Sequence, residues 1–346
     1  FEKNVGAILH MYLGGQAVGE SVADLISGEV NPSGKLAETI PFSEKDTPAW
    51  RYFAPPNDDV EYRESIFVGY RYYETFHVPV KYPFGYGLSY TSFSYSELNV
   101  PEVYSGGKIQ IRFKIKNIGK VSGAEIAQLY ICPIESDVIR SHIELKGFQK
   151  IYLHPGEEKE VILELDERSF SVYDVEKKAF SMLSGKYQIC IGASVHDLQL
   201  KANMEVVGNS YFRNERELFP DYFREQPHGM EISAEQFYQL LGGEPKHDKE
   251  KKRGEYTVYD SYQDVVNVSM FGKIVRGVVH IGLKIILRGK SERDPAFKMV
   301  KMGVEEGNLE GLIATSGGIA TPKLIDMLVY NANKKYLQAL KRLLKK

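Results

Sequence analysis

Residues 107–191 contain several short stretches in which apolar and polar side chains alternate, and this pattern restricts the fold more than any other feature of the chain. In the first stretch Ile109, Ile111, Phe113 and Ile115 share one face, with Gln, Arg and Lys between them. Such alternation is typical of a strand with one buried face. Similar stretches, separated by turn residues, cover residues 126–131, 145–153, 161–165, 180–182 and 187–191. They predict a fibronectin type III-like antiparallel β-sandwich over residues 97–207.

The N-terminal part of the chain has a different pattern. Residues 5–13 form a continuous apolar run, which is typical of a strand buried on both faces of a parallel sheet. Residues 17–26 follow at helical spacing, and Gly28 and the turn at residues 31–34 end that helix. Residues 35–41 are predicted to be extended. We interpret residues 1–96 as the end of an α/β sandwich domain whose earlier strands are absent from the chain.

Residues 62–93, the aromatic corner, join these two parts. Nine tyrosines fall between Tyr52 and Tyr95, and Gly69, Gly85 and Gly87 lie among bulky rings. Aromatic side chains stabilise a protein most when they are buried, so a flexible linker would not concentrate them. We therefore predict a packed corner between two domains.

The C-terminal part is predicted to be a linker followed by a mostly helical extension, residues 208–346. Residues 246–253 are a charge run of the kind found in solvated linkers. Helical spacing is present at residues 234–241, 263–287 and 296–304, and Pro322 begins a long terminal helix. The fold class is thus multidomain, α/β plus β, with predicted domains at residues 1–96, 97–207 and 208–346.

Charge and cysteine content exclude several classes of protein. The chain has 44 Lys and Arg against 46 Asp and Glu, a net charge of −2, which argues against a nucleic-acid binder. The apolar run 271–287 carries Lys273, Arg276 and Lys284, so it is not a membrane-spanning helix and no membrane partner is expected. The same helix could lie on a membrane surface, but packing within the protein is the favoured interpretation. Two cysteines are too few for a disulfide scaffold, which favours a cytoplasmic location.

Several longer sequence motifs in this chain resemble sequences of glycoside hydrolase family 3, the β-glucosidase family. They are GGQAVGESVADLI at residues 14–26, GEVNPSGKL at 28–36, VGYRYY at 68–73 and YPFGYGLSYTSF at 82–93. ELKGF at 144–148, LHPGE at 153–157, FSVYD at 170–174 and the segment 185–194 continue the resemblance into the sandwich. It covers about 60% of the chain. Residues 208–346 are similar to a C-terminal extension of some bacterial members.

The resemblance implies a retaining hydrolase of terminal β-glycosides. Such enzymes use two carboxylates about 5–5.5 Å apart, a nucleophile and an acid/base. In this family the nucleophilic Asp belongs to a preceding barrel domain, and the acid/base Glu comes earlier in the α/β domain. The chain is therefore expected to contain no catalytic residue, no metal site and no cofactor, to meet a β-glucoside or oligosaccharide only through the missing barrel, and to be inactive alone.

Two short sequence motifs resemble the catalytic motifs of the family. Ser136-Asp137 resembles the motif that contains the nucleophile, but it falls in a predicted loop of the sandwich. Ser27-Gly28-Glu29 resembles the motif that contains the acid/base residue, but it falls at the end of a predicted helix. We expect both to be structural turns.

Gln16 and Glu64 are the candidate substrate-binding residues. Gln16 follows a predicted strand and precedes a helix, where α/β sheets bind ligands, although packing and helix capping are the favoured roles. For Glu64, an ion pair with Arg71 or hydrogen bonds to tyrosine hydroxyls are favoured over sugar contact. His10 and His77 have no second ligand at metal spacing, and the word TSGG at residues 315–318 is expected to be a loop rather than an anion site.

Two rival functions remain open. The chain could be a non-catalytic module that binds carbohydrate or a partner protein, which exposed aromatics on the sandwich would favour. Alternatively, it could be one half of a split enzyme whose barrel is a separate chain. A homo-oligomer is also possible.

Overall fold

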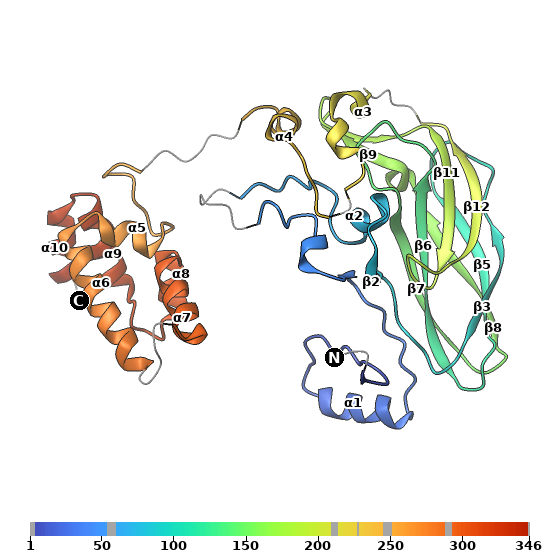
Figure 1. Ribbon diagram of the computed structural model, residues 1–346, viewed down its shortest axis with the longest axis horizontal. Coiled ribbons are helices and arrows are strands. Elements are labelled where there is room, and N and C mark those ends of the chain that lie inside the picture. The colour runs from blue at the N-terminus through green and yellow to red at the C-terminus, as the bar shows by residue number, and fades with distance from the viewer. Residues whose placement is uncertain are drawn as a thin grey trace. The chain divides into compact units, whose positions relative to one another are not determined.

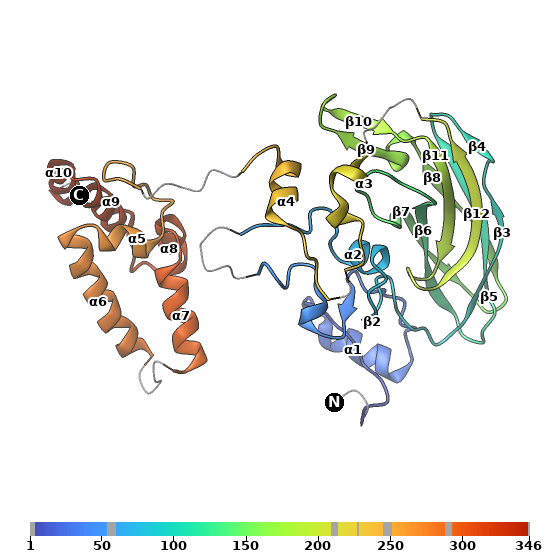
Figure 2. The ribbon, with the colours of Figure 1, turned by 45° about the horizontal axis from the view of Figure 1, so that its top comes forward.

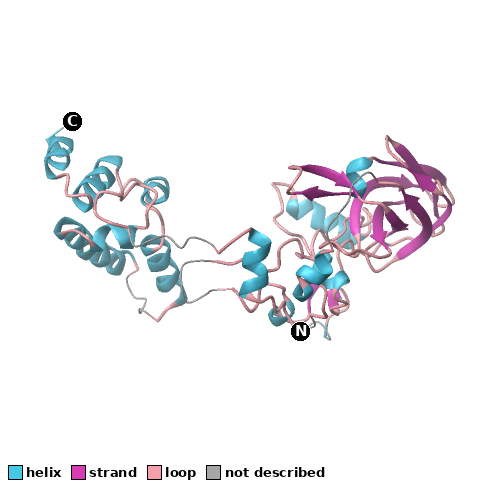
Figure 3. Ribbon diagram, turned by 90° about the horizontal axis from the view of Figure 1, so that it is seen from above, coloured by secondary structure: helices cyan, strands magenta, loops and turns pink. Residues whose placement is uncertain are grey.

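A computed structural model describes residues 4–53, 60–208, 214–226, 228–244, 251–287 and 293–344. The chain divides into two compact units, residues 1–245 and 246–346 (Figure 1). All named strands belong to the first unit, and the described part of the second contains helices and loops (Figure 3).

The first unit is built around a β-sandwich of two sheets. The larger sheet has the strand order β4 (Val103–Tyr104), β12 (Leu198–Val206), β11 (Gly185–Gly192), β6 (Gly123–Pro133) and β7 (Glu144–Leu153). The smaller sheet has the order β3 (Phe93–Asn99), β5 (Ile109–Asn117) and β8 (Glu158–Leu165). Neighbouring strands are antiparallel, except that β4 runs parallel to β12. The predicted fibronectin type III-like sandwich is confirmed.

The alternating side chains of the sequence make the core between these sheets. In β5, Ile111, Phe113 and Ile115 are buried, and Phe113 lies opposite Val161 of β8. Leu129 of β6 lies in the same core from the opposite sheet. A 3-10 turn, η3 (Glu167–Phe170), and the hairpin β9 (Ser171–Asp174) and β10 (Ala179–Met182) follow β8, and their Phe170 and Met182 complete the core. In β5 and β8 apolar residues that face the core alternate with more exposed polar residues, so a slip of one residue would turn the apolar set away from the core.

The predicted domain boundaries remain predictions, but two observations bear on them. Strand β3 runs across residues 96 and 97 and pairs with β5. Residues 214–241, beyond the predicted boundary at 207, pack on the aromatic corner within the first unit.

The N-terminal segment is the least regular part of the first unit. Helix α1 (Val18–Ser27) forms as predicted and ends at Gly28, whose φ of 81° favours glycine. The strand predicted at residues 5–13 was wrong, because these described residues have no strand beside them to hydrogen-bond with. Their apolar side chains are exposed, and Leu13 reaches 101% of its reference area. Beyond α1, β1 (Ile40–Pro41) pairs with β2 (Val80–Tyr82), and a 3-10 turn, η2 (Glu44–Asp46), follows β1.

The aromatic corner is a packed core, as predicted. Helix α2 (Tyr70–Thr75) brings Tyr72 and Tyr73 against Phe67 and Phe76. The second half of this core comes from α3 (Glu215–Leu218), the 3-10 turn η4 (Pro220–Tyr222) and α4 (Ala234–Leu241), which were predicted to belong to the extension. Buried side chains of that segment are Phe219, Tyr222, Met230, Ile232 and Phe237. Figures 1 and 2 place α4 and α2 in the same part of the first unit.

The second unit is helical, as predicted, with shorter helices than expected. They are α5 (Tyr262–Asn267), α6 (Met270–Ile286), α7 (Pro295–Glu305), α8 (Leu309–Thr315), α9 (Pro322–Ala332) and α10 (Tyr336–Leu344). The predicted helix 263–287 is two helices, because the Ser269 side chain caps α6. The predicted long terminal helix is also two. Lys334 has a φ of 59°, and the Asn333 side chain bonds the backbone of Tyr256.

None of the helices in the described ranges is long and apolar enough to cross a lipid bilayer.

The burial pattern of the sandwich predicts that two Phe→Ala substitutions will differ sharply in their effect on stability. Phe113→Ala removes a ring that is 1% exposed, so the free energy of unfolding should fall by about 3–5 kcal/mol. Phe148→Ala on β7 removes a ring that is 67% exposed and should change it by less than about 0.5 kcal/mol. Urea unfolding followed by circular dichroism measures both, and equal losses would contradict the assigned register.

Candidate functional site

Gln16 lies in the turn before α1 and is exposed. The N-cap position before α1 is occupied by Ala17, and no side chain caps the helix. The capping role favoured for Gln16 was therefore wrong. Gln16 and Glu64 are both described, and no hydrogen bond or ion pair joins them.

Glu64 is buried in the aromatic corner, with 5% of its surface exposed. Among the described residues its Oε2 atom has no hydrogen-bond partner. Glu64 and Arg71 form no ion pair although both residues are described, and no tyrosine hydroxyl of the described chain donates to that oxygen. The structural pairing favoured from the sequence was wrong. A buried carboxylate oxygen without a partner is uncommon and marks a candidate functional position.

Burial raises the pKa of Glu64 above its ordinary value, and a hydrogen bond from its own backbone N–H opposes part of this effect. The cause is the removal of the carboxylate from water, which disfavours its charged form.

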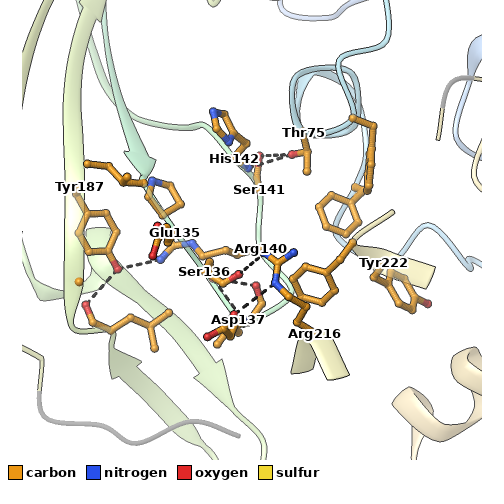
Figure 4. Close-up of a pocket in the computed structure, with 18 of the residues that line it drawn as sticks. Thr75, Glu135, Ser136, Asp137, Arg140, Ser141, His142, Tyr187, Arg216 and Tyr222 are labelled. Atoms are coloured by element: carbon orange, nitrogen blue, oxygen red, sulfur yellow. Dashed lines mark hydrogen bonds and ion pairs between the residues drawn. The ribbon is translucent and has the colours of Figure 1, made fainter. Parts of the chain in front are cut away.

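A cavity of about 1310 Å³ lies where three parts of the first unit meet (Figure 4). Thr75 and His77 come from the aromatic corner, and residues 133–142 come from the loop between β6 and β7. The start of β11 and residues 214–225 provide the remaining walls. Neither the alternating apolar pattern nor the motifs that resemble family 3 indicated this cavity, because its walls come from segments that are far apart in the sequence.

Arg140 is the central buried charge of the cavity wall. Its Nη2 donates to Glu144 Oε1 at 2.8 Å, and its Nη1 donates to the Tyr187 hydroxyl at 3.1 Å. Burial acts to raise the pKa of Glu144, but Arg140 and Lys146 outweigh it and hold that pKa below its ordinary value. Glu144 therefore stays ionised at neutral pH and cannot serve as a general acid. The Nε atom of Arg140 has no partner among the described residues.

Three further polar side chains of the cavity wall bond within the protein. Ser136 Oγ donates to the carbonyl of Val138 at 3.0 Å, and Ser141 Oγ donates to the carbonyl of Ile143 at 2.7 Å. Asp137 lies 3.4 Å from Arg216 in an exposed ion pair. Neither hydroxyl contacts a histidine base, so the serines lack the partner that activates a nucleophile. The cavity can bind a ligand, but neither of these two serines is equipped to attack it.

The two motifs that resemble catalytic motifs lie in a loop and at a helix end, as expected. Ser136 and Asp137 lie in the loop between β6 and β7, and Gly28 ends α1 in the left-handed region. TSGG at residues 315–318 ends α8 and continues into a loop, as predicted.

The histidines contact other rings. His10 packs on the Tyr12 ring with 4.1 Å between centroids, and His77 lies 6.0 Å from His142. Burial and the nearby His77 lower the pKa of His142. Within the described ranges no group of three metal-ligating side chains is present.

The two cysteines lie on neighbouring strands. Their Sγ atoms are 3.9 Å apart, both thiols are buried, and both are free.

Comparisons with known proteins match up to 60% of the chain. Residues 1–90 match the Glycosyl hydrolase family 3 C-terminal domain, and residues 125–195 match the Fibronectin type III-like domain. Residues 1–90 are thus a glycosyl hydrolase family 3 C-terminal domain. The region that matches the family 3 domain comes before the region that matches the fibronectin type III-like domain, and the sandwich likewise follows the N-terminal part in the fold.

Individual relatives cover the same region. Thermostable β-glucosidase B of Acetivibrio thermocellus is 47% identical over 204 residues, 58% of this chain and 27% of that protein. An exo-α-(1→6)-L-arabinopyranosidase of Bifidobacterium breve is 38% identical over 207 residues, 60% of this chain and 27% of that protein. The chain thus spans about a quarter of the length of these relatives. Their different names show that membership in the family does not fix the sugar.

Solved structures agree with this assignment. A family 3 β-glucosidase from Bifidobacterium adolescentis is 37% identical, with a TM-score of 0.56 over 58% of this chain and 30% of that one. β-Glucosidase 3B from Thermotoga neapolitana, in complex with α-D-glucose, is 38% identical, with a TM-score of 0.53 over 57% of this chain and 28% of that one.

The unpartnered oxygen of Glu64 predicts a pH-dependent stability difference. A carboxyl group whose pKa is higher in the folded than in the unfolded state favours folding when it is protonated. The cost of ionisation is absent below the unfolded value of 4.5 and develops as the pH rises through the folded value. Glu64→Gln should therefore stabilise the chain at neutral pH, and the gain should shrink as the pH falls towards 4.5.

Urea unfolding of both proteins across this pH range measures the effect. Glu29→Gln, at an exposed residue after α1, is the matched control and should show no such trend. A Glu64→Gln effect that does not change with pH would contradict the assigned protonation behaviour.

Proposed function

We propose that this chain is the C-terminal part of a retaining, β-glucosidase-like hydrolase that cleaves terminal β-glycosides. The consecutive matches to the two C-terminal domains of family 3 carry the proposal. The proposed reaction passes through a covalent glycosyl-aspartate intermediate, with both catalytic carboxylates outside this chain.

Two carboxylates at or next to the cavity wall support a non-catalytic role for this part of the enzyme. Glu144 is held ionised by Arg140 and Lys146, and Asp137 is paired with Arg216. A retaining pair needs one carboxyl group that stays protonated to act as acid. Glu64 has a raised pKa, but it is buried in the aromatic corner with only 5% of its surface exposed.

Exposed apolar side chains at the N-terminal segment support a partner domain. Val5, Ile8, Leu9 and Leu13 are exposed, and a domain that continued the α/β sheet would cover them. Contact of Gln16 and Glu64 with the sugar remains part of this proposal, as does the cytoplasmic location.

The chain alone should not turn over substrate. Purified protein incubated with an aryl β-glucoside should release the phenol at the uncatalysed rate, because the nucleophile and the acid/base are absent. Mixing with a separately produced family 3 barrel and α/β half tests the split-enzyme alternative, which predicts restored activity. Turnover by the chain alone, unchanged in a Glu64→Gln/Asp137→Asn double variant, would point to a contaminant. Turnover lost in that variant would overturn the proposal.

A second candidate, a carbohydrate-binding surface on the sandwich, rests on β7. Phe113 and Tyr187, the aromatics on the alternating apolar face, lie in the core and are buried. Phe148 and Tyr152 of β7 are instead 67% and 54% exposed. Four residues apart on one strand, they lie about 13 Å from each other on the same face, a spacing at which two rings can stack on separate sugar units.

A titration with soluble glucans tests this second candidate. Binding should be lost in Phe148→Ala/Tyr152→Ala and retained in Tyr173→Ala, which removes an exposed ring from the β9–β10 hairpin. The absence of binding by the unaltered chain would exclude it without affecting the hydrolase proposal.

A further inference from the structure

Helix α6 carries an exposed apolar stripe along its whole length. Its members recur every three or four residues, so they lie on one face. They are between 60% and 78% exposed: Met270, Ile274, Val278, Ile281 and Ile285. Isolated exposed aliphatics are ordinary, but a continuous row over 17 residues indicates an interaction surface.

The opposite side of α6 is already used for packing. Phe271, Val275 and Val279 contact the core of the second unit, which includes α5 and α9. Gly272 is packed so closely that a Cβ atom would come within 2.4 Å of the carbonyl oxygen of Val266. The orientation of the helix is therefore fixed, and the exposed stripe cannot turn inward. Figure 2 shows α6 at one edge of the helical unit.

A basic row flanks the stripe. Lys273, Arg276, His280 and Lys284 also follow helical spacing, and α6 contains no acidic residue. The surrounding unit has the same sign: residues 246–346 contain 20 Lys and Arg against 11 Asp and Glu, a formal charge of +9. The nearly neutral charge of the whole chain conceals this, because residues 1–245 carry −11.

We propose that α6 docks on the surface of an anionic lipid bilayer. The aliphatic stripe inserts at the boundary between headgroups and acyl chains, and the basic row contacts anionic headgroups. No membrane partner was expected from the sequence, because the charges exclude a spanning helix. A helix that lies in the interface, by contrast, requires such charges.

Charge and composition favour this partner over the alternatives. A second copy would bring a unit of charge +9 against one of the same charge, which opposes pairing through this face. Nucleic acid would satisfy the charge, but the five exposed residues of the stripe are aliphatic and provide no ring on which bases stack.

Vesicle co-sedimentation of the full chain tests the proposal. With phosphatidylcholine vesicles that contain about a quarter phosphatidylglycerol, the chain should bind at least about tenfold more tightly than with phosphatidylcholine alone. Raising the salt concentration from about 0.05 to 0.5 M should weaken this binding, because it screens the charges.

Two double variants separate the contributions of the helix. Ile274→Gln/Ile281→Gln should reduce binding about tenfold or more through the lost apolar area. Lys273→Gln/His280→Gln should reduce the preference for phosphatidylglycerol. Ile319→Gln is the matched control, because Ile319 is an exposed isoleucine in the loop after α8. Circular dichroism confirms that each variant is folded.

Three results would overturn the proposal. They are equal affinity for neutral and anionic vesicles, binding that Ile274→Gln/Ile281→Gln leaves unchanged, and no binding at all. Light scattering in the absence of lipid would reveal a dimer that this variant abolishes, and a fluorescent DNA duplex would reveal nucleic-acid binding lost with Lys273→Gln. Either outcome, with no vesicle binding, assigns the surface to that other partner.

Discussion

The first unit depends on buried and half-buried tyrosines whose hydroxyl groups bond the backbone of distant segments. A buried hydroxyl without a partner costs about 1–3 kcal/mol, so each such ring fixes the backbone that satisfies it. Tyr72 donates to the carbonyl of Gln226, and Tyr222 donates to the carbonyl of Arg63. Tyr70 accepts from the amide of Leu145 on β7. The aromatic corner therefore holds the sandwich on one side and residues 214–241 on the other.

This arrangement explains why the cavity lies where it does. Its walls come from the three parts that the tyrosines join, and Arg140 extends the network to Tyr187 of β11. Ion pairs and backbone hydrogen bonds hold its polar groups, so the site is shaped by the same contacts that stabilise the unit. The chain is thus a support whose surfaces are arranged by packing, while the proposed chemistry belongs to residues outside it.

Local patterns predicted the elements whose cause is local. The alternation at Ile109–Asn117 forms a strand because one face meets a core, and α4 at Ala234–Leu241 follows its apolar spacing and its Ser233 cap. The patterns could not predict the docking of residues 214–241, because that core is shared with rings more than a hundred residues away. The run at residues 5–13 has the composition of a strand, yet a strand exists only beside a partner.

The candidate site was predictable only in part for the same reason. Glu64 could be chosen from its place among aromatics, but the absence of a partner for its Oε2 among the described residues is visible only in three dimensions. Ser136 and Asp137 were correctly assigned to a loop, whereas the ion pair of Asp137 with Arg216 joins residues on either side of the last strands of the sandwich. The same holds for the exposed stripe of α6. Its apolar spacing was visible, but which of two apolar faces is buried depends on α5 and α9.

The tyrosine bonds of the corner also set an order of events during synthesis. Tyr72 and Gln226 are 154 residues apart, and Tyr52 and Ile232 are 180 apart. At a translation rate of about 5–20 residues per second, the corner leaves the ribosome roughly ten to thirty seconds before the segment that covers it. The whole sandwich is made in that interval. The rings of the aromatic corner therefore lack this cover on the nascent chain until the sandwich has been made.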